Sequence, residues 1–274
     1  MSIESHVSTA VFEAASAQAL KIVELTRTLT PADMERPTPC KGWMVRDILA
    51  HTTSGGERIN GYLRAVLEDR PTEAFSLADT AAINQRGVDS CRDDPDLVRH
   101  FGEVVDEGLR LFGEIEAGGL GDRPFMFFAV MTPTELAASL AADLATHQWD
   151  YGQALKRPQP PDASILAKTL PSMLEQILPK TFLPEKAGTL VCSYGIKLTD
   201  VQAGEWIIDI NGGQIAVRRE SIAPARVKTI TDAGTFVLLS YGRLNPILQM
   251  LRGRVKSHGN PLLAMKFGSL FQKA

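Results

Sequence analysis

A proline-rich segment divides this sequence into two stretches whose apolar residues repeat with different periods. The segment reads RPQPP at residues 157–161, and consecutive prolines hold a chain extended. Before it, apolar residues recur at the three- and four-residue spacing of amphipathic helices, whereas after it strict alternation indicates strands. We therefore predict two domains, residues 1–157 and 163–274, with the boundary at the prolines.

Long helices are predicted throughout the first domain. The last of them begins most clearly, because Thr132-Pro133-Thr134-Glu135 combines a capping box with proline at the first helical position. A short helix near 77–87 is expected in one of the connections. Long helices joined by polar connections favour an all-α antiparallel four-helix bundle. The apolar spacing places its helices at residues 8–28, about 43–69, about 95–116 and 133–155.

The second domain is predicted to mix strands and helices. Asn211-Gly212-Gly213 between two alternating runs indicates a tight hairpin, because glycine permits the backbone angles of such turns. Helices are expected at about 163–178, from Asp232 to Tyr241 and at the C-terminus. The whole chain is therefore expected to be an α+β multidomain protein. The predicted strands are 190–198, 206–210, 214–218, 226–230 and 254–257.

Composition excludes several classes of protein. The 29 basic and 32 acidic residues give a formal net charge of −3. The chain therefore lacks the excess of positive charge that is typical of proteins that bind nucleic acid or an anionic membrane. The longest apolar runs are far shorter than a bilayer span, and the first residues do not resemble a signal peptide. The 3 cysteines are widely spaced and indicate neither a disulfide framework nor a zinc finger. We expect a cytoplasmic protein that acts on small molecules, without nucleic-acid or membrane partners; the oligomeric state stays open.

Ionisable residues interrupt the apolar stripes of two predicted helices. His51 lies in the stripe of the 43–69 helix, and Asp143 and His147 lie one turn apart in the stripe of the 133–155 helix. Residues i and i+4 point the same way from a helix, so Asp143 and His147 can converge on one point. Burying these three groups without partners would cost several kcal/mol. The fold must therefore supply a binding partner that offsets this cost.

Two arrangements would provide the compensation. One is a divalent metal, because two imidazoles and a carboxylate suit zinc and leave a fourth position open for chemistry. The other is a hydrogen-bonded His–Asp–His network without metal. Asp150, about one turn after His147, either orients that histidine from behind or faces water. Cys40, just before the 43–69 helix, is placed where it could approach the interior end of that helix, and it is interpreted as a small packing residue rather than a nucleophile.

Two motifs in the first domain resemble a known family. Residues 38–51 (TPCKGWMVRDILAH) and 143–150 (DLATHQWD) resemble the two signatures of the mycothiol-dependent maleylpyruvate isomerase family, within the wider DinB-like superfamily. The resemblance implies a DinB-like four-helix bundle that binds a divalent metal, usually zinc, through His51, Asp143 and His147. The family's acid is typically glutamate, so the shorter Asp143 would hold the metal closer to its helix.

The second domain resembles the sterol carrier protein 2 fold. The pattern covers residues 229–271 and includes GRLNP at 242–246 and LRGRVKSHGN at 251–260, followed by an apolar last helix. The resemblance implies a domain that binds apolar molecules beneath its sheet and that, in thiol-dependent isomerases, helps to close the active site. In that architecture Arg243 is the predicted catalytic residue, contacting an anionic substrate. The alternative is an exposed residue at a helix end.

These observations lead to competing functional hypotheses. The leading one is a metal- and low-molecular-weight-thiol-dependent enzyme, an isomerase or a thiol S-transferase, whose metal-bound thiolate attacks a small electrophile that is anionic or apolar. Mycothiol is the thiol that the resemblance implies, with bacillithiol and glutathione as alternatives. Segment 125–128 (FMFF) is expected to form either an apolar pocket wall or a buried structural loop.

The alternative hypothesis is a protein that binds lipid or another apolar ligand through the sterol carrier-like domain, with the helical bundle as a structural element. A third hypothesis is a structural or stress-associated DinB-like protein with a vestigial site, which would bind metal but no thiol. If no thiol binds, the open metal position would hold water for a hydrolytic reaction.

Overall fold

The computed structural model describes residues 3–272, with side chains from Ser8 onward. The chain divides into two compact units, residues 1–161 and 162–273. The first unit is helical apart from one short hairpin, and the second is built on a five-stranded sheet. The predicted fold class, a helical bundle followed by an α+β domain, is confirmed.

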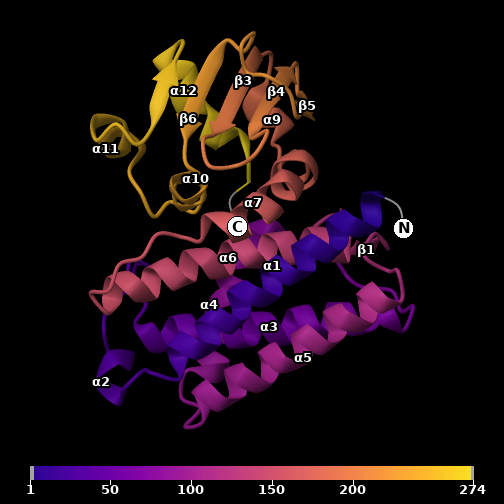
Figure 1. The fold of residues 1–274 in the computed structure, drawn as a ribbon, viewed down its shortest axis with the longest axis vertical. Coiled ribbons are helices and arrows are strands. Elements are labelled where there is room, and N and C mark those ends of the chain that lie inside the picture. The colour runs from indigo at the N-terminus through magenta and orange to yellow at the C-terminus, as the bar shows by residue number, and fades with distance from the viewer. Residues whose placement is uncertain (1–2, 273–274) are drawn as a thin grey trace. The chain divides into compact units, whose positions relative to one another are not determined.

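Four long helices pack together in the first unit. Helix α1 packs on α5 and α6, and α3 also packs on α5 and α6, so that the four close a bundle around an apolar core (Figure 1). Among the described residues, no helix is both long and apolar enough to cross a membrane. The bundle helices are α1 (Ile3–Thr26), α3 (Val45–Leu67), α5 (Leu97–Ala117) and α6 (Pro133–Ala154).

Helix α6 begins at the capping box that the sequence indicates. The Thr132 hydroxyl accepts a hydrogen bond from the backbone N–H of Glu135 at 3.2 Å, and the Glu135 carboxylate accepts one from the N–H of Thr132 at 3.0 Å. Two backbone donors that the first helical turn would leave unpaired are thereby satisfied. The start of α6 is fixed, and with it the position of the functional residues further along the helix.

The connections of the first unit carry shorter elements. Helix α4 packs on α3 and extends beyond the predicted 77–87 segment. The hairpin β1–β2 was not predicted, because strands of 2 residues are too short to show an alternating pattern. These elements are α2 (Pro31–Met34), η1 (Leu77–Asp79), α4 (Thr80–Cys91), β1 (Phe125–Met126) and β2 (Val130–Met131).

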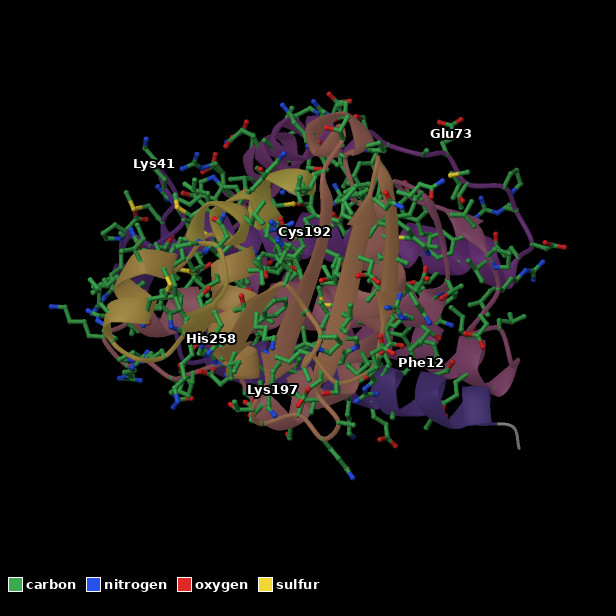
Figure 2. The ribbon with its side chains drawn as sticks, turned by 90° about the horizontal axis from the view of Figure 1, so that it is seen from above. Phe12, Lys41, Glu73, Cys192, Lys197 and His258 are labelled. Carbon is green, nitrogen blue, oxygen red and sulfur yellow. The ribbon has the colours of Figure 1, made fainter. Side chains whose placement is uncertain are left out.

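The second unit contains a mixed sheet with strand order β5-β4-β3-β6-β7. Strands β3 and β6 are parallel and the other neighbours are antiparallel. Cys192 and Lys197 lie near the two ends of β3, and His258 ends the edge strand β7 (Figure 2). The strands are β3 (Val191–Leu198), β4 (Glu205–Asn211), β5 (Gln214–Arg218), β6 (Val227–Thr231) and β7 (Lys256–His258).

Short helices precede and follow the strands of this unit. Helix α7 continues into the π-helical turn η2, whose Glu175 accepts a hydrogen bond at 2.8 Å from the indole N–H of the buried Trp206. The helical elements are α7 (Ala163–Ser172), η2 (Met173–Ile177), α8 (Leu178–Lys180), α9 (Pro184–Ala187), α10 (Ala233–Ser240), α11 (Pro246–Leu251), α12 (Pro261–Phe267) and η3 (Gly268–Leu270).

The hairpin between β4 and β5 forms where the sequence predicts it. Gly212 and Gly213 occupy its two turn positions with φ values of 55° and 85°. Positive φ at both central residues is the requirement of the two-residue turn whose twist matches that of paired strands. The turn sets Asn211 opposite Gln214 and so fixes the register of the pair.

His100 links three segments of the first unit. Its Nδ1 lies 2.9 Å from a carboxylate oxygen of Asp94, and its Nε2 lies 3.0 Å from one of Glu57 on α3. Burial by itself would lower the pKa of His100, but the two carboxylates outweigh that effect and raise it. A raised pKa in the folded protein stabilises it at pH values below the unfolded-state pKa of about 6.5. That contribution is lost as the pH rises through the folded-state pKa.

We therefore expect the substitution His100→Gln to lower the free energy of unfolding more at about pH 6 than at about pH 9. The difference should stay below about 1 kcal/mol, since His100 is partly exposed and solvent screens the ion pairs. Urea unfolding of the wild type and the variant at both pH values measures it. Glu57→Gln should show a loss with the same pH dependence. Equal losses for His100→Gln at the two pH values would contradict the assignment.

Candidate metal centre

A tight turn before α3 brings two side chains to the candidate site. The Thr38 hydroxyl donates to the carbonyl of Trp43 at 2.8 Å and accepts from the N–H of Cys40 at 3.2 Å. Gly42 has a φ of 86°, a value that glycine adopts without steric cost. The motif at 38–43 is therefore a turn whose backbone is held by its own threonine. It directs Cys40 and Trp43 toward the helices behind it.

The three residues predicted as metal ligands lie together. His51 comes from α3, and Asp143 and His147 come from α6; one ligand atom from each lies within 4.8 Å of the others. The Nε2 atom of His147 is 3.7 Å from a carboxylate oxygen of Asp143. The imidazole rings of His51 and His147 meet edge to face with their centroids 5.1 Å apart. The indole ring of Trp43 covers His51 at a centroid distance of 5.1 Å.

This geometry fits a divalent cation. In a tetrahedral zinc site the ligand atoms are roughly 2.1 Å from the metal and hence roughly 3.4 Å from one another. The 3.7 Å between His147 and Asp143, and the 4.8 Å limit for the set, need only small side-chain rotations to reach that spacing. Two imidazole nitrogens and one carboxylate oxygen form a donor set that zinc accepts, with a fourth position left over.

Asp143 is more exposed than the apolar stripe predicts. Its side chain is 37% exposed, compared with 5% for His147. Its neighbours Ser139 and Leu140, one turn earlier on α6, are also only partly covered. Asp143 therefore lies at the rim of the cluster, where its helix is partly exposed, and not at the buried centre of the cluster. The cluster is therefore partly exposed on the Asp143 side.

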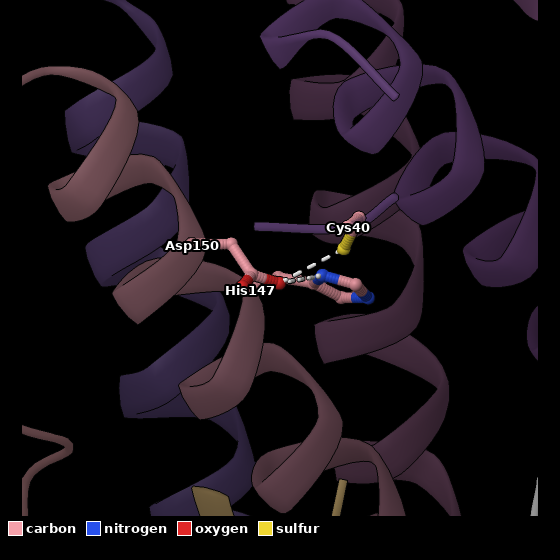
Figure 3. A group of neighbouring side chains, drawn as sticks. All are labelled: Cys40, His147 and Asp150. Carbon is pink, nitrogen blue, oxygen red and sulfur yellow. Dashed lines mark hydrogen bonds and ion pairs between the residues drawn. The ribbon is translucent and has the colours of Figure 1, made fainter. Parts of the chain in front are cut away.

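A second acid supports His147 from the buried side. Asp150, whose side chain is 0% exposed, lies 3.1 Å from Nδ1 of His147 and accepts a hydrogen bond from the Cys40 thiol at 3.1 Å (Figure 3). Of the two interpretations of Asp150, the structure supports the one in which its carboxylate orients the ring of His147. With its Nδ1–H donated to Asp150, a neutral His147 presents the Nε2 lone pair to His51 and Asp143. Cys40 is thus a member of the site, a role that its interpretation as packing missed.

The charges around His147 determine its protonation in the metal-free protein. Burial by itself would lower its pKa, but the carboxylate of Asp143 and the hydrogen bonds of Asp150 and Cys40 outweigh burial and raise the pKa to about 10. Without metal, His147 is therefore an imidazolium between two carboxylates. A cation that binds this cluster has to displace that proton. The sequence left two arrangements open, a hydrogen-bonded network without metal and a metal site. Both use the same residues.

Arg243, the predicted catalytic residue, lies in the second unit. It follows α10, is half-buried, and donates from Nη1 to the carbonyl of Tyr241 at 3.0 Å. Its contact with an anionic substrate stays a prediction.

Comparisons with protein families and curated proteins match the two units separately. The model described as the mycothiol maleylpyruvate isomerase N-terminal domain matches residues 15–152. The SCP-2 sterol transfer family matches residues 174–272. Among curated proteins, hydroxysteroid dehydrogenase-like protein 2 of Xenopus tropicalis is 26% identical over 141 residues, which are 51% of this chain and 32% of that protein. The chain therefore spans about a third of the length of that relative.

Solved structures show the same two-part fold. The crystal structure of the mycothiol-dependent maleylpyruvate isomerase gives a TM-score of 0.54 at 13% identity, over 94% of this chain and 93% of the other. A histidine-to-alanine mutant of that isomerase gives a TM-score of 0.56 at 12% identity with the same coverage. Because the helical family model spans half of the sequence, this chain belongs to the mycothiol maleylpyruvate isomerase N-terminal domain family, and an SCP-2 sterol transfer domain follows.

Proposed function

We propose that this protein is a metal- and thiol-dependent enzyme, an isomerase or a thiol S-transferase, that acts on a small electrophile. The convergence of His51, Asp143 and His147 within 4.8 Å carries the proposal. Membership of a family named for a mycothiol-dependent isomerase supports it, and makes mycothiol the thiol to test first. Zinc is the metal that the donor set favours.

Each residue of the cluster has a distinct task in this proposal. His51 and His147 would hold the cation through ring nitrogens, and Asp143 would hold it from the accessible rim. Asp150 keeps the ring of His147 in place from the buried side, 3.1 Å from Nδ1, and Trp43 packs on the ring of His51. When bound, a divalent cation supplies the positive charge that lowers the pKa of a thiol and populates its thiolate at neutral pH.

The reaction classes share their first step. The thiolate sulfur forms a bond to one carbon of an electron-poor double bond, and the π electrons move to the carbonyl oxygen conjugated with it. In an isomerisation the resulting single bond rotates, the electrons return, and the C–S bond breaks to release the thiolate unchanged. In an S-transfer the adduct takes up a proton on carbon and leaves as a thioether. The protein has to orient both reactants and stabilise the transient negative charge.

The second unit supports a second candidate function, because it matches the SCP-2 sterol transfer family. Binding of an apolar ligand by this unit is the alternative to an enzymatic role. Purified protein that carries acyl chains but no zinc would favour this alternative.

Cobalt substitution tests the enzymatic proposal. Addition of mycothiol to the cobalt-loaded full-length protein should produce an intense sulfur-to-cobalt charge-transfer band, since a borderline-soft cation with an open position favours thiolate over water. His51→Ala and His147→Ala should abolish the band. Asp143→Glu should keep it, because glutamate retains the carboxylate, and His258→Ala on the exposed edge strand serves as the control. The proposal fails if neither mycothiol, bacillithiol nor glutathione changes the spectrum.

Asp150 provides a test that does not depend on the thiol. We expect Asp150→Asn to weaken zinc binding by about 10- to 100-fold, as is typical when the acid behind a ligating histidine is removed. Competition with a chromogenic chelator measures the affinity, and thermal unfolding of the metal-free variant checks the fold. Cys40→Ala should weaken zinc binding less, because it removes one hydrogen bond to Asp150 and leaves the contact between Asp150 and His147. Unchanged zinc affinity in Asp150→Asn would refute this role.

A further inference from the structure

The two units carry net charges of opposite sign. Residues 1–161 contain 15 basic and 24 acidic side chains, whereas residues 162–274 contain 14 basic and 8 acidic ones, which gives formal charges of −9 and +6. The basic excess is greatest at the end of the chain, because residues 233–274 hold 6 lysines and arginines and no acid. The total of −3 conceals this difference. The expectation of no membrane partner rests on that total and therefore does not apply to the second unit.

Exposed apolar side chains are concentrated in the same part of the chain. Ten large apolar side chains are exposed in the described part of the protein, and six of them lie between Ile247 and Met265. Helix α11 has 6 residues, of which only Gln249 is buried, and Leu251 at its end is 81% exposed. Single exposed apolar side chains are common on protein surfaces, but a cluster of them marks a contact surface.

Helix α12 packs on the sheet with one face and exposes apolar side chains on another. The Tyr194 hydroxyl on β3 donates to the carbonyl of Leu263 at 3.1 Å, and the rings of Tyr194 and Phe267 pack with their centroids 4.9 Å apart. Leu262 and Met265 are neighbours on the helix surface, because they are three residues apart. Their side chains are 75% and 70% exposed. Contact with the sheet therefore holds α12 with these two side chains in solvent.

The two helices precede and follow β7, an edge strand of the sheet. The strand order is β5-β4-β3-β6-β7, so β7 forms one edge and β5 the other. Helix α11 lies at the outer margin of the second unit (Figure 1). Strand β7 has 3 residues and spans about 10 Å, so α11 and α12 are close enough to contact one flat surface together. We call residues 246–267 the edge segment.

The basic residues of the edge segment lack acidic partners. Arg252, Arg254 and Lys256 are exposed, and among the described residues no carboxylate forms an ion pair with them. By contrast, Arg218 on the opposite edge strand β5 pairs with Asp209 at 2.7 Å. The edge segment therefore presents positive charges beside exposed apolar side chains, and neither is satisfied within the described part of the protein.

We propose that the edge segment docks on an anionic lipid bilayer. Leu251 and Leu262 enter the outer part of the acyl region, where they leave water. Arg252 and Arg254 contact the lipid phosphates, and each basic residue near an anionic bilayer strengthens binding by about fivefold. Nucleic acid would match the basic residues but would leave the leucines in water, whereas a bilayer accounts for both. The inference concerns the second unit alone and does not rest on the metal-dependent activity.

Co-sedimentation of the full-length protein with lipid vesicles tests the proposal. Vesicles of phosphatidylcholine that contain about one third phosphatidylglycerol should bind the protein at least about tenfold more tightly than vesicles of phosphatidylcholine alone, because several basic residues act together. Raising the salt concentration from about 0.1 M to about 0.5 M should weaken this binding, since salt screens the charges. Equal binding to the two kinds of vesicle, or none to the anionic vesicles at about 1 mM lipid, would overturn the proposal.

Two matched pairs of variants locate the contact. Arg254→Gln should weaken binding to the anionic vesicles by about fivefold, whereas Arg218→Gln removes the same charge from the opposite edge of the sheet and should have little effect. Leu251→Ser should weaken binding by about tenfold, whereas Val130→Ser, at a side chain of the first unit that is 55% exposed, should not. All four side chains are exposed, and circular dichroism checks the fold. Equal losses within either pair refute the placement at the edge segment.

Further measurements distinguish a bilayer from other occupants of this surface. The added indole of Leu251→Trp should be quenched by vesicles whose lipids carry bromine on the acyl chains, which shows entry into the acyl region. Sedimentation velocity that finds a dimer in the wild type and a monomer in Leu251→Ser would assign the surface to a second copy of the chain and overturn the proposal. Binding to a short DNA duplex that is tighter than binding to vesicles, and that Leu251→Ser leaves unchanged, would also overturn it.

Discussion

Everything at the candidate site depends on how the bundle accommodates the buried imidazole of His147. The ring is 5% exposed, and Asp150 behind it is 0% exposed. An imidazole at this depth needs a polar partner for each nitrogen, because an unpaired buried polar group costs about 1–3 kcal/mol. Asp150 accepts a hydrogen bond from Nδ1 on the buried side, and Asp143 lies 3.7 Å from Nε2 on the partly exposed side. The site is therefore fully buried behind the histidine and partly exposed in front of it, at Asp143.

Helix α3 contributes both to the core and to the candidate site. Ile48, Leu49 and Leu63 are fully buried in the bundle, whereas His51 lies in the candidate metal cluster. Rotation of the helix about its axis would expose these apolar side chains to water, at a cost of about 1.5–3 kcal/mol for each. Core packing thus fixes the direction of His51, and the stability of the bundle and the geometry of the site depend on the same rigid element.

Several features of the structure were predictable because they depend on neighbours in sequence. The capping box at Thr132 sets the start of α6, and the glycine pair at 212–213 sets the hairpin of the second unit. The stripes of α3 and α6 identified His51, Asp143 and His147, since a helix turns through a known angle per residue. The β1–β2 hairpin was missed, because a pairing of 2 residues on each side carries too little pattern.

The sequence by itself determined which residues share one stripe of a helix, and its capping box determined where α6 begins. It did not determine which of two acids near His147 would be buried. Tertiary structure made Asp150 the buried acid and Asp143 the acid at the rim, and it brought Cys40 to Asp150. The physical reason is that periodicity gives the angle of a side chain about its own helix axis, whereas exposure and contact depend on where the neighbouring helices and loops lie.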